Sequence, residues 1–267
     1  MEAKTRSDSR QGLIDLDDSD HDSGLGESIS DSSYSATLVS SIRNYTYENG
    51  RRYHAYQSGQ YLLPNDDEEQ DRLDLLHHIV RLELGGALYL APVKDRSRPA
   101  RILDVGTGTG IWAIEIAEEF PEAVVIGTDL SPIQPVWVPP NCRFYVDDAE
   151  AQWAFSSDEH FDFIHGRGLA GSIADWAKFY RQAYQNLNPG GWLEMQEYAV
   201  GITSDDDTIQ RAPWIREWSQ QIDVATTRLG KRLNVAHMHK QWFQEAGFGD
   251  VREHVVKVPL KQCTVMR

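Results

Sequence analysis

Cysteines are scarce and long apolar runs are missing from this sequence of 267 residues. The two cysteines, Cys142 and Cys263, offer neither a disulfide framework nor a metal-ligand spacing, which favours a reducing compartment. No apolar run approaches the roughly 20 residues that a membrane helix needs, and the N-terminus lacks the apolar core of a signal peptide. We therefore expect a nuclear or cytoplasmic protein that is neither secreted nor bound to a membrane.

Basic residues are outnumbered, with 26 Lys and Arg against 41 Asp and Glu, for a net charge of −15. Residues 1–40 hold nine acidic and three basic residues, which accounts for −6 and leaves −9 on the remainder. A protein that binds nucleic acid directly needs a clustered basic face. We expect no direct nucleic-acid partner, and we predict that the Ser-rich, acidic segment 1–40 is a disordered tail.

A glycine-rich loop lies between a predicted strand at 101–105 and a predicted helix at 111–120. The apolar residues of the first segment indicate a buried strand, and those of the second recur at helical spacing. Strand, loop and helix together form a nucleotide-type binding element at the carboxyl end of a parallel strand. The loop contributes Gly106, Thr107, Gly108 and Gly110, and the helix places Ile111, Ile114, Ala117 and Phe120 near one face.

The loop spacing and one carboxylate predict the ligand. A dinucleotide fingerprint requires its third glycine at the position of Ile111. Asp104 stands two residues before the first glycine and would repel a pyrophosphate. S-adenosylmethionine carries an ammonium and a sulfonium but no phosphate, so it fits this loop better than NAD. An NAD-dependent oxidoreductase is the disfavoured alternative.

Carboxylates follow the next two predicted strands. The strand at 123–130 contains Asp129, nineteen residues past Gly110, where a carboxylate can accept both ribose hydroxyls. The strand at 142–146 precedes two further aspartates, of which Asp148 is the first choice for the adenine amine and Asp147 the alternative. We expect their neighbours Leu130 and Ala149 to contact the cofactor as well.

Two residues are candidates for a catalytic base. His165 ends a predicted strand at 161–165, and Arg167 follows it at the edge where open α/β sheets bind ligands. His165 either acts as a base or lines the cofactor pocket. Glu197 lies on a predicted strand at 192–198, after a helix at 175–187 and a Pro-Gly-Gly turn. The Asn/Asp-Pro-Pro-aromatic motif of nucleic-acid amino methyltransferases is absent after 165, which disfavours a base substrate.

The last part of the chain departs from the alternation of strands and helices. Residues 202–234 form a predicted insertion with an amphipathic helix, whose stripe includes Trp214 and Trp218. A helix at 237–247, capped by Gly247, and a sixth strand at 251–258 follow. The tail 261–267 is atypical. The predicted α/β domain spans 99–260 and includes this insertion.

An arm at 41–98 precedes this domain. Five tyrosines, Tyr53 among them, stand between residues 41 and 64. They indicate either a cofactor lid, since aromatic faces attract a sulfonium, or a plain packing arm. A helix follows, with Asn65 as its expected N-cap, Glu68 as the capping-box partner, and Gly85 at its end.

From about residue 45 to 260 the chain resembles class I S-adenosylmethionine-dependent methyltransferases. Within them it is similar to the fungal LaeA-like group, which is associated with the velvet complex and secondary metabolism. The segments that carry this resemblance are 47–54, 103–110, 127–135, 138–141, 147–150 and 187–191.

The resemblance implies a Rossmann-like α/β sheet with helices on both faces. It implies cofactor contacts at Asp104, Gly106, Gly108, Asp129 and Asp148, and velvet-type partners in a nuclear or nucleocytoplasmic setting. Family members continue past the equivalent of Leu260, so we expect the last strand of the sheet to be missing. We expect a methyltransferase of protein or small-molecule acceptors; the alternative is a cofactor-binding regulatory scaffold without turnover.

Overall fold

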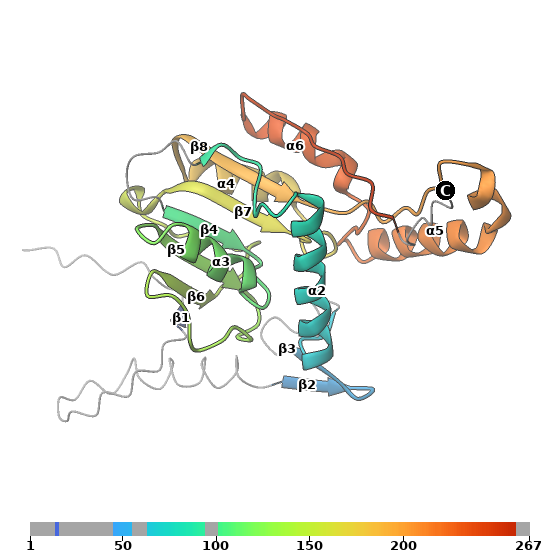
Figure 1. The fold of residues 1–267 in the computed structure, drawn as a ribbon, viewed down its shortest axis with the longest axis horizontal. Helices are drawn as coiled ribbons and strands as arrows, with labels where there is room; N and C mark the ends of the chain where they lie inside the picture. The colour runs from blue at the N-terminus through green and yellow to red at the C-terminus, as the bar shows by residue number, and fades with distance from the viewer. Residues whose placement is uncertain (1–13, 16–44, 55–62, 94–100, 260–267) are drawn as a thin grey trace, which may run out of the picture.

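Five parallel strands form the centre of the molecule (Figure 1). The computed structural model describes residues 14–15, 45–54, 63–93 and 101–259. The sheet order is β1–β6–β5–β4–β7–β8, with β1 antiparallel to β6 and the other neighbours parallel. Its strands are β1 (Ile14–Asp15), β4 (Arg101–Val105), β5 (Val124–Asp129), β6 (Cys142–Val146), β7 (Phe161–Arg167) and β8 (Leu187–Gln196). The predicted α/β fold is confirmed, and the order reverses between β4 and β7.

Helices cover both faces of the sheet, because alternate residues of each buried strand point to opposite sides. Ile102, Val125 and Phe163 belong to the core beneath α3 (Ile111–Glu119). Leu103 and Ile164 belong to a second core, which also contains residues of α4 (Trp176–Gln185) and α6 (His239–Ala246). The two cores hold the parallel strand ends in place.

Helix α3 buries a face rotated from the expected one. Trp112, Ala113, Ile116 and Ala117 are buried, whereas the predicted Ile111, Ile114 and Phe120 are half-buried; of the predicted stripe, Ala117 lies in the core, and Ile114 and Phe120 pack at its edge. The Trp112 indole Nε1 donates to the Leu88 carbonyl at 2.9 Å, and its ring meets Phe163 edge-on at 6.0 Å. This large side chain sets the rotation of the helix.

The strand β8 begins earlier than expected. Leu187 already pairs with Phe161, and Trp192 pairs with Phe163, so β8 advances five residues while β7 advances two. The Pro-Gly-Gly segment is therefore a bulge inside the strand rather than a turn before it. The 3-10 helix η2 (Ser157–Glu159) precedes β7.

The N-terminal arm consists of a hairpin, β2 (Tyr45–Glu48) with β3 (Arg51–His54), and helix α2 (Asp67–Glu83). The expected N-cap, Asn65, was wrong: the Asp66 carboxylate caps the helix by accepting from the Glu69 N–H at 3.1 Å. Asn65 instead donates to the Ser131 hydroxyl at 3.3 Å, which ties the arm to the loop after β5. As predicted, α2 ends before Gly85.

After β8 the chain forms η3 (Asp207–Arg211), α5 (Pro213–Arg228), η4 (Ala236–Met238) and α6. The predicted strand at 251–258 was wrong, because residues 251–259 form no strand and Val255 is 79% exposed. An alternating strand needs a neighbour for its backbone, and in the part of the chain that the structure describes nothing pairs with the outer edge of β8. Apart from Ile14–Asp15, the predicted tails 1–40 and 261–267 lie outside the described residues.

Candidate functional site

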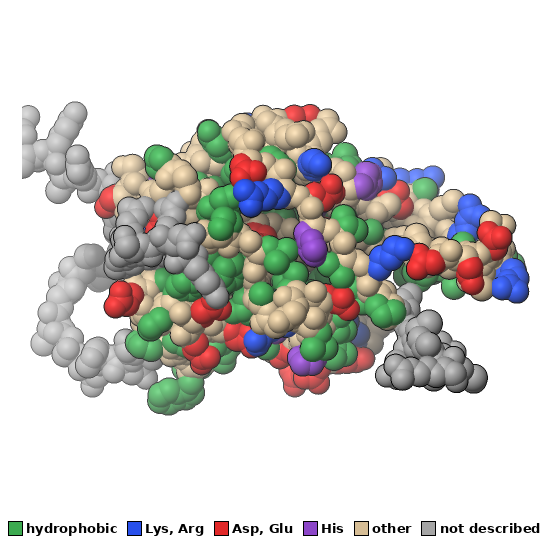
Figure 2. Space-filling view, turned by 45° about the horizontal axis from the view of Figure 1, so that its top comes forward, with side chains coloured by type: hydrophobic (Ala, Val, Ile, Leu, Met, Phe, Trp, Pro, Cys, Tyr) green, Lys and Arg blue, Asp and Glu red, His purple; other side chains and the backbone are tan. Residues whose placement is uncertain are grey.

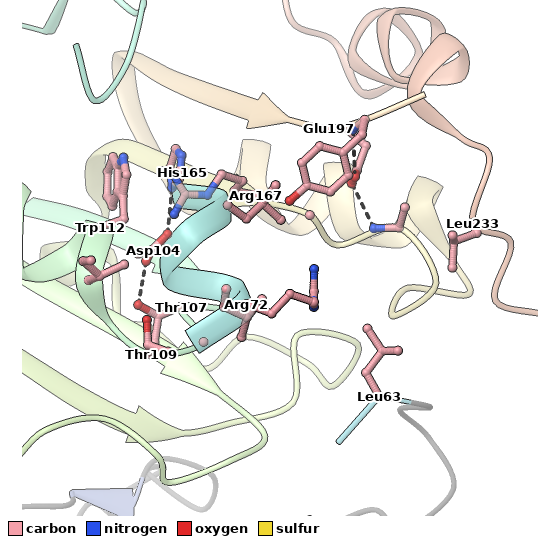
Figure 3. A pocket seen from close by; sticks show the side chains of 18 of the residues that line it. Leu63, Arg72, Asp104, Thr107, Thr109, Trp112, His165, Arg167, Glu197 and Leu233 are labelled. Carbon is pink, nitrogen blue, oxygen red and sulfur yellow. Dashed lines mark hydrogen bonds and ion pairs between the residues drawn. The ribbon is translucent and has the colours of Figure 1, made fainter. Parts of the chain in front are cut away.

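A cavity of about 370 Å³ opens at the carboxyl ends of β4 and β7, where the strand order changes direction (Figure 3). Ligands bind at this place in open α/β sheets. Side chains from the glycine loop, β7, α2 and the segments after β8 and α5 surround it. Among them are Arg72, Asp104, Gly106, Thr107, Gly108, Trp112, His165, Arg167, Glu197, Tyr198 and Leu233.

Asp104 and His165 form a buried pair on the inner wall. The register of β4 and β7 sets them side by side, and the His165 Nδ1 lies 2.7 Å from the Asp104 Oδ1. The Thr107 hydroxyl donates to the other carboxylate oxygen at 2.6 Å. The imidazole stacks on Trp112, with ring centres 3.7 Å apart. Asp104 accepts the Nδ1 proton, so Nε2 carries the lone pair; it is buried and has no hydrogen-bond partner among the described atoms.

The glycine loop turns tightly around the strand end. Gly106 and Gly108 have φ angles of +65° and +59°, in the left-handed region that favours glycine. A Cβ on Gly106 would lie 2.4 Å from the Leu169 Cδ2. The Gly108 N–H donates to the Asp129 Oδ2 at 2.8 Å, and the Ser131 N–H donates to its Oδ1 at 2.9 Å. Asp129 therefore holds the glycine loop next to the end of β5.

A chain of polar side chains links α3 and α2 to β7. The Arg167 Nη2 lies 2.9 Å from the His77 Nδ1, and the His77 Nε2 lies 3.0 Å from the Glu115 Oε2. Because an arginine only donates, His77 accepts at Nδ1 and donates at Nε2, so it is neutral. Burial and the Arg167 charge lower the pKa of His77 accordingly. Arg167 lies two residues after His165, hence on the same face of β7.

Glu197 lies across the cavity from Asp104 (Figure 3), and its neighbour Tyr198 lines the same cavity. The Glu197 carboxylate accepts from the Ala170 N–H at 2.9 Å and the Tyr198 N–H at 3.2 Å. Burial raises the pKa of Glu197 to about 7 and that of Tyr198 to about 12. Glu194 lies elsewhere, where it accepts from the Leu90 N–H at 2.8 Å.

The cavity brings together only part of the predicted site. Asp147 and Asp148 follow β6: the Asp148 N–H donates to Asp147 Oδ1, and the Glu150 N–H to Asp148 Oδ1, both at 2.8 Å. Burial raises the pKa of Asp147 and of Asp129 to about 6. The predicted residues that do not line the cavity are Tyr53, Gly110, Asp129, Leu130, Asp148 and Ala149.

Sequence reasoning missed the contribution of helix α2 to the cavity. Arg72, Leu73 and Leu76 line it, as does Leu233, which follows α5 in the sequence. The only available signal was the helical stripe of leucines, which equally fits ordinary packing.

Within the described ranges, no group of three His, Cys, Asp or Glu side chains has the arrangement of a metal site. No helix there has the length and apolarity to cross a membrane.

The family described as a methyltransferase domain matches residues 69–253. The chain belongs to this family. Methyltransferase pytC of Aspergillus terreus is 44% identical over 87% of this chain and 71% of that protein. The secondary metabolism regulator LAE1 of Cochliobolus heterostrophus is 40% identical over 79% of this chain and 70% of that protein. Phosphoethanolamine N-methyltransferase 2 of Haemonchus contortus, solved with S-adenosyl-L-methionine, has a TM-score of 0.43 and 18% identity, covering 82% of this chain and 59% of that one.

The family match and the two fungal relatives confirm the expected LaeA-like methyltransferase family, whose cofactor is S-adenosylmethionine. Two features of the methyltransferase cavity fit the amino-acid end of that cofactor. The buried His165 Nε2 can accept a hydrogen bond from an ammonium, and the Arg167 guanidinium can donate to a carboxylate. The fit rests on side chains from adjacent positions of one strand face.

Proposed function

We propose that this methyltransferase binds the methionine part of S-adenosylmethionine in the cavity between β4 and β7. The Asp104–His165 pair accepts hydrogen bonds from the α-ammonium, and Arg167 donates to the carboxylate. The unpartnered His165 Nε2 is the observation that carries this proposal, since a buried acceptor beside a cavity requires a donor. The backbone of Gly106 and Gly108 lets the methionine chain approach closely.

The nucleoside half extends, in this proposal, over the ends of β5 and β6. Asp129 accepts from the ribose hydroxyls and Asp148 from the adenine amine, while Leu130 and Ala149 flank the base. Both carboxylates already accept backbone N–H groups, Asp129 from Gly108 and Ser131 and Asp148 from Glu150, which fixes their orientation. A carboxylate has about four acceptor sites, so capacity for the ligand remains.

The cofactor supplies a methyl group already activated by its sulfonium, so alignment and exclusion of water account for much of the rate. Glu197 is the better proton acceptor of the two candidates, because its pKa of about 7 matches the pH of the cell. His165 is fully buried and held by Asp104, which suits a positioning residue. A protonated acceptor nucleophile would lose its proton to Glu197.

We further propose a regulatory role in secondary metabolism, in the nucleus and with velvet-type partners. The support is the name of the LAE1 relative, a secondary metabolism regulator. Protein and small-molecule acceptors both stay open. A cofactor-binding scaffold without turnover is the alternative, and transfer of a labelled methyl group to an acceptor would exclude it.

The experiment is a calorimetric titration with two ligands that share the nucleoside: S-adenosylhomocysteine and 5′-methylthioadenosine, which lacks the amino-acid end. Arg167→Met should weaken the first by about tenfold or more, the loss expected for a charge-assisted hydrogen bond, and leave the second unchanged. The matched control Arg252→Met, whose side chain is 72% exposed, should alter neither. Equal weakening of both ligands would contradict the assignment of Arg167; binding of neither by the wild type would contradict the cavity.

A further inference from the structure

Among the α-helices of the described residues, α5 is the least covered. Of its 16 residues only Thr226 is buried, while Trp214 is 78% and Trp218 55% exposed. The helix stands out from the body of the molecule at the right of both views (Figures 1 and 2). Large aromatic side chains on a projecting helix mark an interaction surface rather than a folding core.

Five apolar residues of α5 and its C-cap form one stripe, in which Ile222 is half-buried and the others are exposed, while Ile215 and Val224 are exposed outside it. Trp214, Trp218, Ile222, Ala225 and Leu229 follow one another at spacings of three or four residues, so they share a helix face. The spacing of the stripe residues is nearly the same on the two sides of Ile222. A large residue three or four positions away on one side corresponds to a smaller one on the other.

We propose that this stripe binds α5 of a second copy of the chain, with the two helices antiparallel about a two-fold axis at Ile222. In such an isologous contact Trp214 faces Leu229 of the second copy, and Trp218 faces its Ala225. Each indole thus meets a smaller side chain, which permits close packing. Ile222 packs against itself.

Charges beside the stripe fit the same arrangement. Glu217 and Arg228 lie eleven residues apart, which is about 20° around the helix, so both flank one side of the stripe. No ion pair joins either of them to another described residue, whereas the other acid of the helix, Asp223, is paired with Arg232 at 2.9 Å. An antiparallel partner brings its Arg228 to Glu217 and its Glu217 to Arg228. The two ion pairs then lie along the same edge of the seam, one towards each end.

The charge balance argues against a lipid surface as the occupant. Helices that lie on membranes carry many Lys and Arg beside the apolar face. Helix α5 carries Arg216 and Arg228 against Glu217 and Asp223, in a chain of net charge −15. Its length is about 24 Å, so the contact is smaller than the roughly 800 Å² per partner of a standard interface. We therefore expect a dimer that dissociates at micromolar concentration.

The test is sedimentation velocity of the full chain between about 1 and 100 μM, a range that brackets a micromolar Kd. The wild type should pass from monomer to dimer. Glu217→Arg and Arg228→Glu should each weaken the dimer by about tenfold or more, because like charges then face each other. The double variant should restore it. Arg216→Glu, on the far side of the helix, is the matched control and should leave the dimer unchanged.

These side chains are exposed, so the variants should keep the melting temperature of the wild type in the monomer range. A chain that stays monomeric at the highest concentration overturns the proposal. A dimer that is weakened neither by Trp218→Ser nor by either single charge reversal also overturns it. If Trp218→Ser weakens binding to a velvet-type protein while the chain itself stays monomeric, the surface serves that partner and the second copy is likewise excluded.

Discussion

Two tryptophans show how differently the two sides of this molecule are built. Trp112 on α3 is 1% exposed, stacks on His165 and donates to the Leu88 carbonyl. Trp214 on α5 is 78% exposed. The first holds the inner wall of the cavity, where the cofactor chemistry is proposed, and the second stands on a surface that the rest of the chain leaves uncovered. The scaffold thus fixes the first indole, whereas the second is free for the contact that we propose for α5.

The same substitution in both places should give the largest difference. Trp112→Ala removes a buried indole and should lower the free energy of unfolding by about 3–5 kcal/mol. Trp214→Ala should change it by less than about 0.5 kcal/mol, because an exposed side chain loses little on truncation. Urea unfolding of both variants, at a concentration where the chain is monomeric, measures this. Similar losses would mean that α5 packs on the body far more than its exposure indicates.

A pair of glycines separates backbone strain from a steric clash. Gly110 has a φ of +81°, and a Cβ there would lie 2.5 Å from the Phe144 Cζ. Gly230 has a φ of +78° with nothing within 4 Å. Gly230→Ala should cost about 1–2 kcal/mol for the left-handed conformation alone. Gly110→Ala should cost about 2–4 kcal/mol, since the clash adds to it. Equal costs in urea unfolding would show that Phe144 yields freely.

The strands and the glycine loop were predictable because their signals are local. The apolar residues Ile102, Leu103 and Val105, followed by three glycines, specify a strand, a turn and a helix within twenty residues of sequence. The positions of Asp104 and Asp129 near the carboxyl ends of their strands follow directly from the predicted strands. Strand β6 coincided with its predicted bounds.

Other features of the cavity and of the arm depend on contacts between residues that are far apart in the sequence. Arg167 meets His77 across 90 positions, and Asn65 leaves its expected capping role for Ser131, 66 positions away. The position after Asn65 is also a good cap, and Arg51 selects it by binding the Asp66 carboxylate at 2.6 Å. No periodicity in the sequence encodes such choices. The rotation of α3 likewise follows from the volume of Trp112 against Phe163.

Glu197 offers a test of the outer wall through pH. Its pKa is about 7 in the folded chain and near 4.5 in the unfolded one, so the folded state holds the proton more tightly between these values. The contribution of Glu197 to stability is therefore fully present below pH 4.5 and is lost as the pH rises through 7. Glu197→Gln should remove this fall and gain roughly 2 kcal/mol relative to the wild type at pH 8, discounted from the full shift because the side chain is half-buried. Thermal unfolding at both ends of the range measures it; parallel curves would contradict the raised pKa.

The smallest effect should come from the segment whose predicted strand was wrong. Val255 is 79% exposed in a stretch without strand pairing, whereas Val125 is buried within β5 and pairs with Cys142. Val255→Pro should change the free energy of unfolding by less than about 0.5 kcal/mol, because no ladder hydrogen bond is lost. Val125→Pro should cost at least about 3 kcal/mol, since proline removes a donor in the middle of a sheet. Amide exchange should show 251–259 unprotected and β5 protected. Slow exchange at Val255 would contradict this expectation and would indicate that residues 251–258 form the predicted strand along the edge of β8.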